Sequence, residues 1–305
     1  MRTEPAGLST RAVLAAAEAR LAAAGVSTPR ADAEWLLAGL LGCGRSALTA
    51  RLGERLPPPV SSAYAAALER RCRREPLQRI LGWEEFRGLR LRVTADVLIP
   101  RPETEVLVEV ALGMLPSRGG ARVVDVGTGS GCVACAIAWE RPACRVLAID
   151  RSPAALAVAR ANVAALGLTD RVGLVCADVL EAVGADGVDL VVANPPYLPT
   201  DLLPSLPPEV RDHEPRLALD GGPDGLALIR RLIAGAARAL RPGGGLALET
   251  AGGDQAQAVA RWLEQAGFGE VALTSDLAGV PRILAARRPR GDGRQTGEAL
   301  LRARA

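Results

Sequence analysis

Short apolar runs alternate with longer helical segments from residue 121 to about residue 286. Apolar runs bounded by glycine, proline or polar residues predict strands, and apolar residues at helical spacing predict the helices between them. The predicted strands are 122–126, 145–149, 172–176, 188–193, 246–249, 270–275 and 282–286, and the helices include 153–166, 225–240 and 255–266. This alternation predicts an α/β fold with a mostly parallel sheet covered by helices on both faces. Only a loop separates the last two strands, so we expect them to be antiparallel neighbours.

Residues 1–80 have a different pattern, which predicts a small helical domain. Its helical segments are 11–24, 30–41, 45–52 and 60–74, and Ser9 or Thr10 can cap the first of them. Residues 84–94 predict a β-hairpin with its turn at Arg87-Gly88, and residues 102–115 predict a helix. We therefore expect a helical domain at 1–80, a hairpin linker at 81–100, a catalytic domain at 101–288 and a disordered tail at 289–305.

Composition changes the picture mainly by excluding classes of protein. The 305 residues are enough for one α/β core and a small second domain. The chain has no lysine, and 37 arginines against 34 acidic residues leave a net charge of +3, which argues against a strongly basic nucleic-acid-binding protein. No apolar run approaches the roughly 18 residues of a membrane helix, and residues 1–12 lack the apolar core of a signal peptide. We expect a cytoplasmic protein with no membrane partner and no direct nucleic-acid binding.

The cysteines and the single histidine do not predict a metal site. Cys132 and Cys135 form a lone C-x-x-C, whereas structural zinc needs four ligands. His213 is the only histidine, so multi-histidine sites are excluded, and we interpret it as a structural loop residue. The remaining cysteines, which are Cys43, Cys72, Cys144 and Cys176, are scattered and mostly lie among apolar residues. Free thiols in a reducing compartment are the expected state.

A glycine-rich loop follows the first predicted strand of the catalytic domain. Alternating glycines at the end of a strand allow positive φ angles and close approach of the backbone to a ligand. A lone G-x-G-x-G is weak on its own, because several nucleotide-binding folds share it. The cofactor-binding residues expected here are Asp125, Gly127, Thr128, Gly129, Ser130 and Gly131.

Two further carboxylates follow the next two predicted strands. Asp150 ends the second strand about 20 residues after the glycine loop, where it could accept both hydroxyls of a ribose. Enzymes that use NAD and enzymes that use S-adenosylmethionine share this arrangement. Asp178 lies just beyond the third strand and could contact the edge of an adenine, although a surface loop position would also explain it.

The sequence Asn194-Pro195-Pro196-Tyr197 follows the apolar strand 188–193. Ligands bind at the carboxyl ends of strands in open α/β sheets. An amide nitrogen is a poor nucleophile and needs acceptors that hold its NH2 group in place, and the Asn194 side-chain oxygen and the Pro195 carbonyl can serve. The prolines stiffen the turn, and Tyr197 offers a flat face to a planar group. The loop is thus a candidate catalytic and substrate-binding site for planar nitrogens.

This loop resembles the motif of methyltransferases that modify planar nitrogens, and other blocks are more selective. Residues 98–105 (Leu-Ile-Pro-Arg-Pro-Glu-Thr-Glu) resemble the signature of the peptide chain release factor N(5)-glutamine methyltransferase family. Further blocks that resemble it are 76–82, 85–86, 214–219 and 221–226, so that the similarity extends from about 76 to 284.

The resemblance implies a class I methyltransferase fold with an N-terminal helical domain, and S-adenosyl-L-methionine as cofactor. Cofactor contacts are implied at 127–131, Asp150, Asp178, Val179 and Asn194, and the substrate glutamine at 194–197. The implied partner is a peptide chain release factor, and we expect residues 1–80 to dock its body. The implied reaction is direct methyl transfer, in which positioning supplies much of the acceleration and no general base is needed.

The chain departs from the family pattern at two places. The family usually has Glu, a variable residue and Gly after the fifth strand, whereas this chain has Glu249-Thr250-Ala251. This leaves the geometry of that loop open. Val179 stands where some relatives have a large aromatic residue, so adenine stacking should be weaker there.

Three other functions remain possible from the sequence. A nucleic-acid methyltransferase acting on adenine or guanine amino groups would use the same 194–197 loop, but it needs a recognition module that is commonly basic. The related glutamine methyltransferase of a ribosomal protein has a Pro-Arg-Ser-Pro signature, whereas this chain has Pro-Arg-Pro-Glu at 100–103. A non-catalytic binding protein is disfavoured by the intact glycine loop, Asp150 and Asn194.

Overall fold

The computed structural model describes residues 9–116 and 119–290. The chain divides into two compact units. The first runs to Trp83 and also includes Leu206–His213, and the second consists of Glu84–Ser205 and the described residues from Glu214 onward. The chain therefore passes between the units three times. The tail expected at 289–305 lies outside the described residues, apart from its first two.

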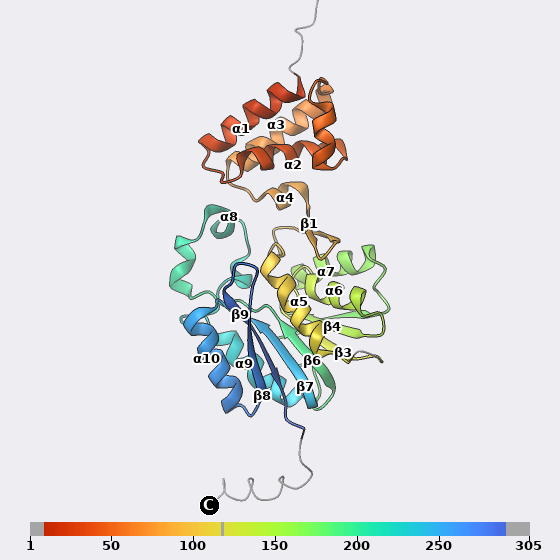
Figure 1. Cartoon of the computed structure of the whole chain (residues 1–305), viewed down its shortest axis with the longest axis vertical. Helices are drawn as coiled ribbons and strands as arrows, with labels where there is room; N and C mark the ends of the chain where they lie inside the picture. The colour runs from red at the N-terminus through yellow and green to blue at the C-terminus, as the bar shows by residue number, and fades with distance from the viewer. Residues whose placement is uncertain (1–8, 117–118, 291–305) are drawn as a thin grey trace, which may run out of the picture. The chain divides into compact units, whose positions relative to one another are not determined.

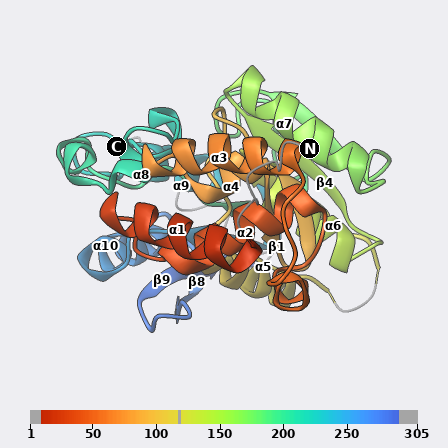
Figure 2. The ribbon, with the colours of Figure 1, turned by 90° about the horizontal axis from the view of Figure 1, so that it is seen from above.

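The first unit is a helical bundle, as the apolar spacing predicts. Its elements are α1 (Thr10–Ala23), α2 (Pro29–Leu41), the 3₁₀ helix η1 (Arg45–Arg51), α3 (Pro58–Cys72) and α4 (Leu77–Leu81). Ser9 caps α1 by accepting a hydrogen bond from the Ala12 N–H at 3.4 Å. Figure 2 shows the three longer helices side by side, and their facing leucines form one core. The predicted helices are confirmed to within two residues at each end.

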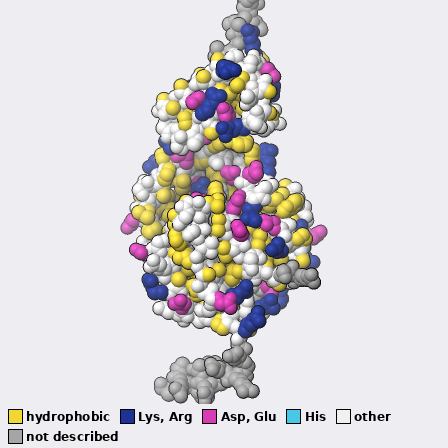
Figure 3. Space-filling view, in the orientation of Figure 1, with side chains coloured by type: hydrophobic (Ala, Val, Ile, Leu, Met, Phe, Trp, Pro, Cys, Tyr) yellow, Lys and Arg dark blue, Asp and Glu magenta, His cyan; other side chains and the backbone are white. Residues whose placement is uncertain are grey.

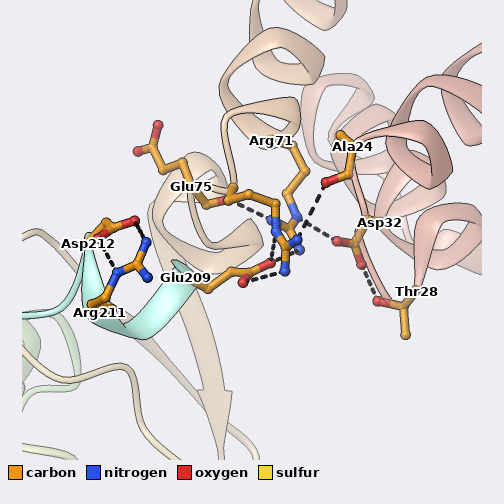
Figure 4. Close-up of polar contacts among 9 residues, drawn as sticks. Ala24, Thr28, Asp32, Arg71, Glu75, Glu209, Arg211 and Asp212 are labelled. Carbon is orange, nitrogen blue, oxygen red and sulfur yellow. Dashed lines mark hydrogen bonds and ion pairs between the residues drawn. The ribbon is translucent and has the colours of Figure 1, made fainter. Parts of the chain in front are cut away.

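The segment 206–213 belongs to this helical unit although it lies more than 100 residues further along the chain. It contains the short helix α8 (Pro208–Arg211). Glu209 in α8 accepts two hydrogen bonds of 2.7 Å from Arg74 and one of 3.0 Å from Arg71. Arg71 also donates to Asp32 at 2.7 Å, so that a partly buried ion network joins α2, α3 and α8 (Figure 4). The sequence pattern gave no sign of this contact.

The second unit is built on a seven-stranded sheet of order β5-β4-β3-β6-β7-β9-β8. Its strands are β3 (Arg122–Val126), β4 (Arg145–Asp150), β5 (Val172–Cys176), β6 (Val188–Ala193), β7 (Leu240–Glu249), β8 (Gly269–Ser275) and β9 (Pro281–Arg287). β3 to β7 are parallel, and β9 is antiparallel to both β7 and β8. The predicted strands are confirmed, but β7 begins at Leu240 and not at residue 246. Gly243 and Gly244 lie within a register shift opposite β6, and a sequence pattern cannot distinguish such a shift from a turn.

Helices cover both faces of this sheet (Figure 1). One face carries α5 (Pro102–Met114), α6 (Cys132–Glu140) and α7 (Pro153–Ala165), and the other carries α9 (Ala227–Ala239) and α10 (Gly253–Gln265). Successive strand residues point to opposite faces, so Val123 packs in one core and Val124 in the other. The doubly covered sheet explains why its central strands are continuous apolar runs.

The predicted hairpin consists of β1 (Trp83–Phe86) and β2 (Leu89–Arg92). Arg87 and Gly88 have φ angles of 48° and 73°, as a two-residue type I′ turn requires. Asn162 of α7 donates to the Arg92 carbonyl at 3.0 Å and accepts from the Arg92 N–H at 2.7 Å. This pair of bonds fixes the start of the segment that leads to α5.

The described residues contain no helix long and apolar enough to cross a membrane. Within the same part of the chain, no group of three His, Cys, Asp or Glu residues could hold a metal ion, and the cysteines are free thiols. Arginine and acidic side chains are interspersed on the face drawn in Figure 3.

Candidate active site

A cavity of about 780 Å³ opens in the second unit at the carboxyl ends of the parallel strands. Its wall is formed by the loops that follow β3, β4, β5 and β6, together with the segment before α5 and the loop at 215–222. Of the predicted site residues, those in the wall are Asp125, Gly127, Thr128, Gly129, Ser130, Asp150, Asp178, Val179, Asn194 and Pro196. Residues that the sequence placed in separate loops therefore share one cavity.

The glycine loop adopts the conformation that its glycines allow. All three have positive φ, namely Gly127 (72°), Gly129 (54°) and Gly131 (82°). Asp125 braces the loop from below, because its Oδ2 accepts hydrogen bonds from the Thr128 hydroxyl at 2.6 Å and from the Ala134 N–H at 3.2 Å. Burial raises the pKa of Asp125 to about 7, although both hydrogen bonds favour its charged form. Gly131 is not in the cavity wall, since it forms the N-cap of α6.

Asp150 lies at the end of β4 with its carboxylate already fixed by backbone groups. Oδ2 accepts from the Gly129 N–H and Oδ1 from the Ser152 N–H, both at 2.9 Å. Each carboxylate oxygen can accept further hydrogen bonds, so the side chain can receive two neighbouring hydroxyls in a fixed orientation. Asp150 thus ties the glycine loop to the expected ribose position.

Asp178 and Val179 form the wall after β5. Asp178 makes an ion pair with Arg231 at 2.7 Å, and both side chains are exposed. Val179 is buried with a positive φ of 50°, which is uncommon for a β-branched residue. Such backbone strain is often retained at ligand sites. The position offers an apolar contact but no aromatic face.

Asn194 follows β6 and is held by residues far away in the sequence. Its Nδ2 donates to Thr104 Oγ1 at 3.0 Å, and Thr104 in turn donates to Glu249 Oε2 at 2.9 Å. The Tyr197 hydroxyl donates to the other carboxylate oxygen, Glu249 Oε1, at 3.2 Å. Burial raises the pKa of Glu249 to about 6 against the hydrogen bonds from Thr104 and Tyr197. One buried carboxylate therefore supports both ends of the turn 194–197.

Pro195 and Tyr197 are not among the residues that line the cavity. The Tyr197 ring packs against the core beneath α9 and α10. The backbone carbonyl of Tyr197 accepts a hydrogen bond from Gln255 Nε2 at 2.9 Å. Tyr197 thus contributes to holding the turn in the structure, and the flat face that the sequence predicts for the substrate stays a prediction.

The sequence reasoning missed three residues of this site. The sequence pattern assigns no role to Thr104, although it lies in the 98–105 block, and it distinguishes Glu249 only by the unusual residues that follow it. Arg101 lines the cavity and makes two hydrogen bonds of 2.7 Å with Glu214, whose side chain is 1% exposed. The one signal for Glu249 in the sequence was a carboxylate at the end of an apolar strand, where ligands bind in such sheets.

Known proteins match almost the whole of this chain. Residues 12–82 match the family model of the PrmC N-terminal domain, and residues 103–201 match that of the methyltransferase small domain. The release factor glutamine methyltransferase of Cereibacter sphaeroides is 46% identical over 276 residues, which cover 90% of this chain and 97% of the relative. That of Moorella thermoacetica is 49% identical over 252 residues, or 83% and 88% of the two chains. The chain belongs to the release factor glutamine methyltransferase family.

Solved structures agree on the fold of this family member. A methyltransferase from Pyrococcus furiosus aligns with a TM-score of 0.51 at 20% identity, covering 67% of this chain and 90% of that one. The hMettl16 catalytic domain, solved with the MAT2A 3′UTR hairpin 6, aligns with a TM-score of 0.53 at 19% identity, covering 77% and 83%. At these identities the likeness concerns the class I methyltransferase fold alone.

The loop after β7 departs from the family pattern without strain at the substituted residues. Its positive φ angles fall on Gly252 (84°) and Gly253 (53°), so Ala251 does not have to adopt one. The Ala251 N–H donates to Gln255 Oε1 at 2.8 Å, and the Thr250 hydroxyl donates to the Arg282 carbonyl at 3.1 Å. Gly252 and Gly253 thus supply the backbone flexibility that the family pattern places at the position of Ala251.

The cavity residues fit the S-adenosylmethionine that the family and fold imply. A Cβ at Gly127 would meet no atom within 4 Å, so the backbone there faces open space. Asp150 supplies acceptors for hydroxyls, Val179 supplies an apolar surface, and Asn194 lies in the same wall. These groups match the ribose, adenine and reacting ends of such a molecule.

Proposed function

We propose that this protein methylates the side-chain amide nitrogen of a glutamine in a peptide chain release factor, with S-adenosyl-L-methionine as the methyl donor. The main structural observation behind this proposal is that Asn194 lies in the wall of the same cavity as the glycine loop and Asp150. The names of the relatives supply the substrate class. When bound, the cofactor supplies an electrophilic methyl group on a sulfonium.

The chain's own residues act by positioning. The glycine loop, Asp150 and Val179 hold the donor, while Asn194 Oδ1 and the Pro195 carbonyl accept hydrogen bonds from the substrate NH2 group. Both acceptors become stronger partners as positive charge develops on the nitrogen. The methylated nitrogen then loses a proton readily to water, so no side chain has to act as a base beforehand. Pro196 and Tyr197 complete the substrate turn by keeping it stiff.

The direct test is incubation of the purified protein with isotope-labelled cofactor and a purified release factor. Mass spectrometry of the digested release factor should locate one methyl group on a glutamine side chain. A ribosomal protein, a DNA duplex and a structured RNA serve as competing substrates in parallel reactions. Label on any of these, with none on the release factor, would replace this proposal by one of the alternative methyltransferase functions.

We further infer that residues 1–80 dock the body of the release factor. A glutamine side chain is small and common, so the cavity alone cannot select one protein, and selectivity needs a second contact surface. The model of the PrmC N-terminal domain covers this part of the chain, which carries no cofactor motif. Docking is binding that does not change in the reaction, so it should lower KM and leave kcat unchanged.

The docking role can be tested with the intact enzyme by shortening the substrate. A peptide carrying only the glutamine-bearing loop should be methylated with a KM higher than that of the whole release factor by about tenfold or more, at similar kcat. Equal KM values would contradict docking and leave residues 1–80 with a structural role. We place the protein in the cytoplasm, where release factors act and where its free cysteines would stay reduced.

A further inference from the structure

A chain of hydrogen bonds runs from a buried carboxylate to the amide of Asn194. The Thr104 hydroxyl donates to Glu249 Oε2 at 2.9 Å, and the same hydroxyl oxygen accepts from Asn194 Nδ2 at 3.0 Å. Glu249 and Thr104 are 1% and 2% exposed, so bulk water does not compete for these bonds. The three residues come from α5, from the loop after β6 and from the end of β7, and they meet only in the folded protein.

The direction of this chain follows from what each group can donate. An ionised carboxylate only accepts hydrogen bonds, and a hydroxyl has a single hydrogen to give. Once Thr104 gives its hydrogen to Glu249, its oxygen can only accept from Asn194. Asn194 must then turn its NH2 group toward Thr104, which leaves Oδ1 for another partner. Hydrogen-bond chemistry, and not shape alone, therefore selects one of the two orientations of the amide.

We propose that Thr104 and Glu249 are positioning residues that fix the Asn194 amide with its oxygen toward the substrate nitrogen. The proposal rests on the proposed function, because only an NH2-bearing substrate needs an acceptor there. If the Asn194 amide were reversed, its NH2 group would meet the NH2 group of the substrate glutamine. Two donors would then face each other and neither would be satisfied.

The strand pairing and the position of α5 bring the three residues together. β6 and β7 are parallel, and Ala193 pairs with Leu248, so Asn194 and Glu249 leave the sheet on neighbouring strands. Thr104 lies in the first turn of α5, within hydrogen-bond distance of Asn194 and Glu249. The Tyr197 hydroxyl binds the second oxygen of the Glu249 carboxylate at 3.2 Å, so the carboxylate cannot rotate away from Thr104 without losing Tyr197.

The charge of Glu249 makes the direction of this chain of hydrogen bonds depend on pH. Burial raises the pKa of Glu249 to about 6, with Thr104, Tyr197 and Arg282 favouring the charged form and Glu103 opposing it. Above that pH the carboxylate can only accept hydrogen bonds, and the bonds from Asn194 through Thr104 to Glu249 have one possible direction. Below it, the protonated carboxyl can donate to Thr104, whose hydroxyl is then free to donate to Asn194 Oδ1. The Asn194 oxygen is then no longer reserved for the substrate.

The first experiment removes the hydroxyl of Thr104 while keeping its shape. Thr104→Val should lower kcat about 10- to 100-fold, as loss of a preorganised polar contact does, and change the cofactor Kd by less than about twofold. Thr104→Ser keeps the hydroxyl and should recover most of kcat. The matched control is Thr10→Val, since Thr10 is equally buried and its hydroxyl donates to the Glu54 carbonyl within the helical unit, which contributes no residue to the cavity wall. That variant should lose stability but keep kcat.

A second experiment asks whether Thr104 acts through Asn194. Asn194→Ala and the double variant Asn194→Ala with Thr104→Val should have the same kcat, because no amide remains to be oriented. Three results would each overturn the proposal. These are a wild-type kcat in Thr104→Val, equal impairment of Thr104→Ser and Thr104→Val, and additive losses in the double variant. A wild-type enzyme that does not methylate release factor would count instead against the proposed function.

The third experiment measures the pH profile of kcat. The wild-type profile should fall on the acid side with a midpoint near 6, and Glu249→Gln should lower kcat and lose this limb. Asp125 also titrates near pH 7, but its contribution is common to both proteins and is removed by the comparison. An unchanged acid limb in Glu249→Gln would show that Glu249 only fills space.

Discussion

Asp150 should contribute more to cofactor binding than Asp178, the other carboxylate at the edge of the cavity. Asp150→Ala should weaken binding of S-adenosylmethionine by about 1.5–3 kcal/mol, because a carboxylate accepting hydroxyl hydrogens contributes that much. The matched control is Asp178→Ala, since Asp178 is exposed and already paired with Arg231. Its effect should be smaller, within about 1 kcal/mol. Calorimetric titration of both folded variants is the measurement, and equal losses would contradict the assignment of the ribose to Asp150.

Asn194 should affect the reaction more than the binding of the donor. Asn194→Ala should reduce turnover by roughly two orders of magnitude or more, since it removes an acceptor aimed at developing charge. Cofactor affinity should fall much less, because Asp150 and the glycine loop remain. Single-turnover rates at saturating cofactor would measure this separately from binding. A near-normal rate would exclude the mechanism proposed for the turn 194–197.

Single residues were predictable from sequence where local position decides their role. Asp150 and Asn194 each end a recognisable strand, and parallel strand ends meet at one edge of a sheet. Thr104 was not predictable in this way, because its partners lie 90 and 145 residues away. Tyr197 illustrates the opposite case. Its place in the motif was clear, but only the fold shows that its hydroxyl is occupied by Glu249.

At the level of elements, alternation of apolar runs was enough to locate the strands. Period and length distinguish buried strands from helices, and the glycines and prolines mark their ends. The short elements at 200–218 were not predicted, since they lie in a proline-rich stretch with no periodicity. α8 has four residues, and its place in the helical unit depends on Glu209 and two arginines of a distant helix end.

The ion network of α8 should stabilise the protein measurably. Burial opposes ionisation of Glu209, but hydrogen bonds from Arg74 and Arg71 outweigh it and lower its pKa to about 2. Glu209→Gln should lower the free energy of unfolding by about 2–3 kcal/mol, because it removes the charge that accepts two hydrogen bonds from Arg74 and one from the buried Arg71. In the same segment, Asp212 pairs with the exposed Arg211 on the protein surface, so Asp212→Asn should leave the free energy of unfolding nearly unchanged.

The same carboxylate should give the stability a defined dependence on pH. The pKa of Glu209 is lower in the folded protein than its ordinary value of 4.5, so its contribution is present above that value and is lost as pH falls toward 2. Urea unfolding at several pH values should therefore show a smaller difference between wild type and Glu209→Gln at pH 3 than at pH 6. A difference that does not vary with pH would mean that the two arginines do not bind the carboxylate.

At the level of the whole molecule, the helical unit is not a simple N-terminal attachment. The chain enters it again at 206–213, directly after the stretch that continues from the turn 194–197. Removing residues 1–75 would leave Glu209 without Arg71 and Arg74, so a truncated chain would keep the segment 206–213 but not the residues that it packs with in the helical unit. We expect amide exchange of α8 and of α3 to change together when Glu209 is replaced, whereas independent changes would contradict their coupling.

The return of the chain to its first unit also has a consequence for synthesis on the ribosome. Arg71 and Arg74 are made 138 and 135 residues before Glu209, so the ion network cannot form until most of the protein has been translated. Domains usually fold in order as they emerge, but the contacts of this unit are complete only after a segment that lies much later in the sequence has been made. Nascent chains that stop before Leu206 should therefore hold their N-terminal helices in a more protease-sensitive state than chains that extend beyond His213.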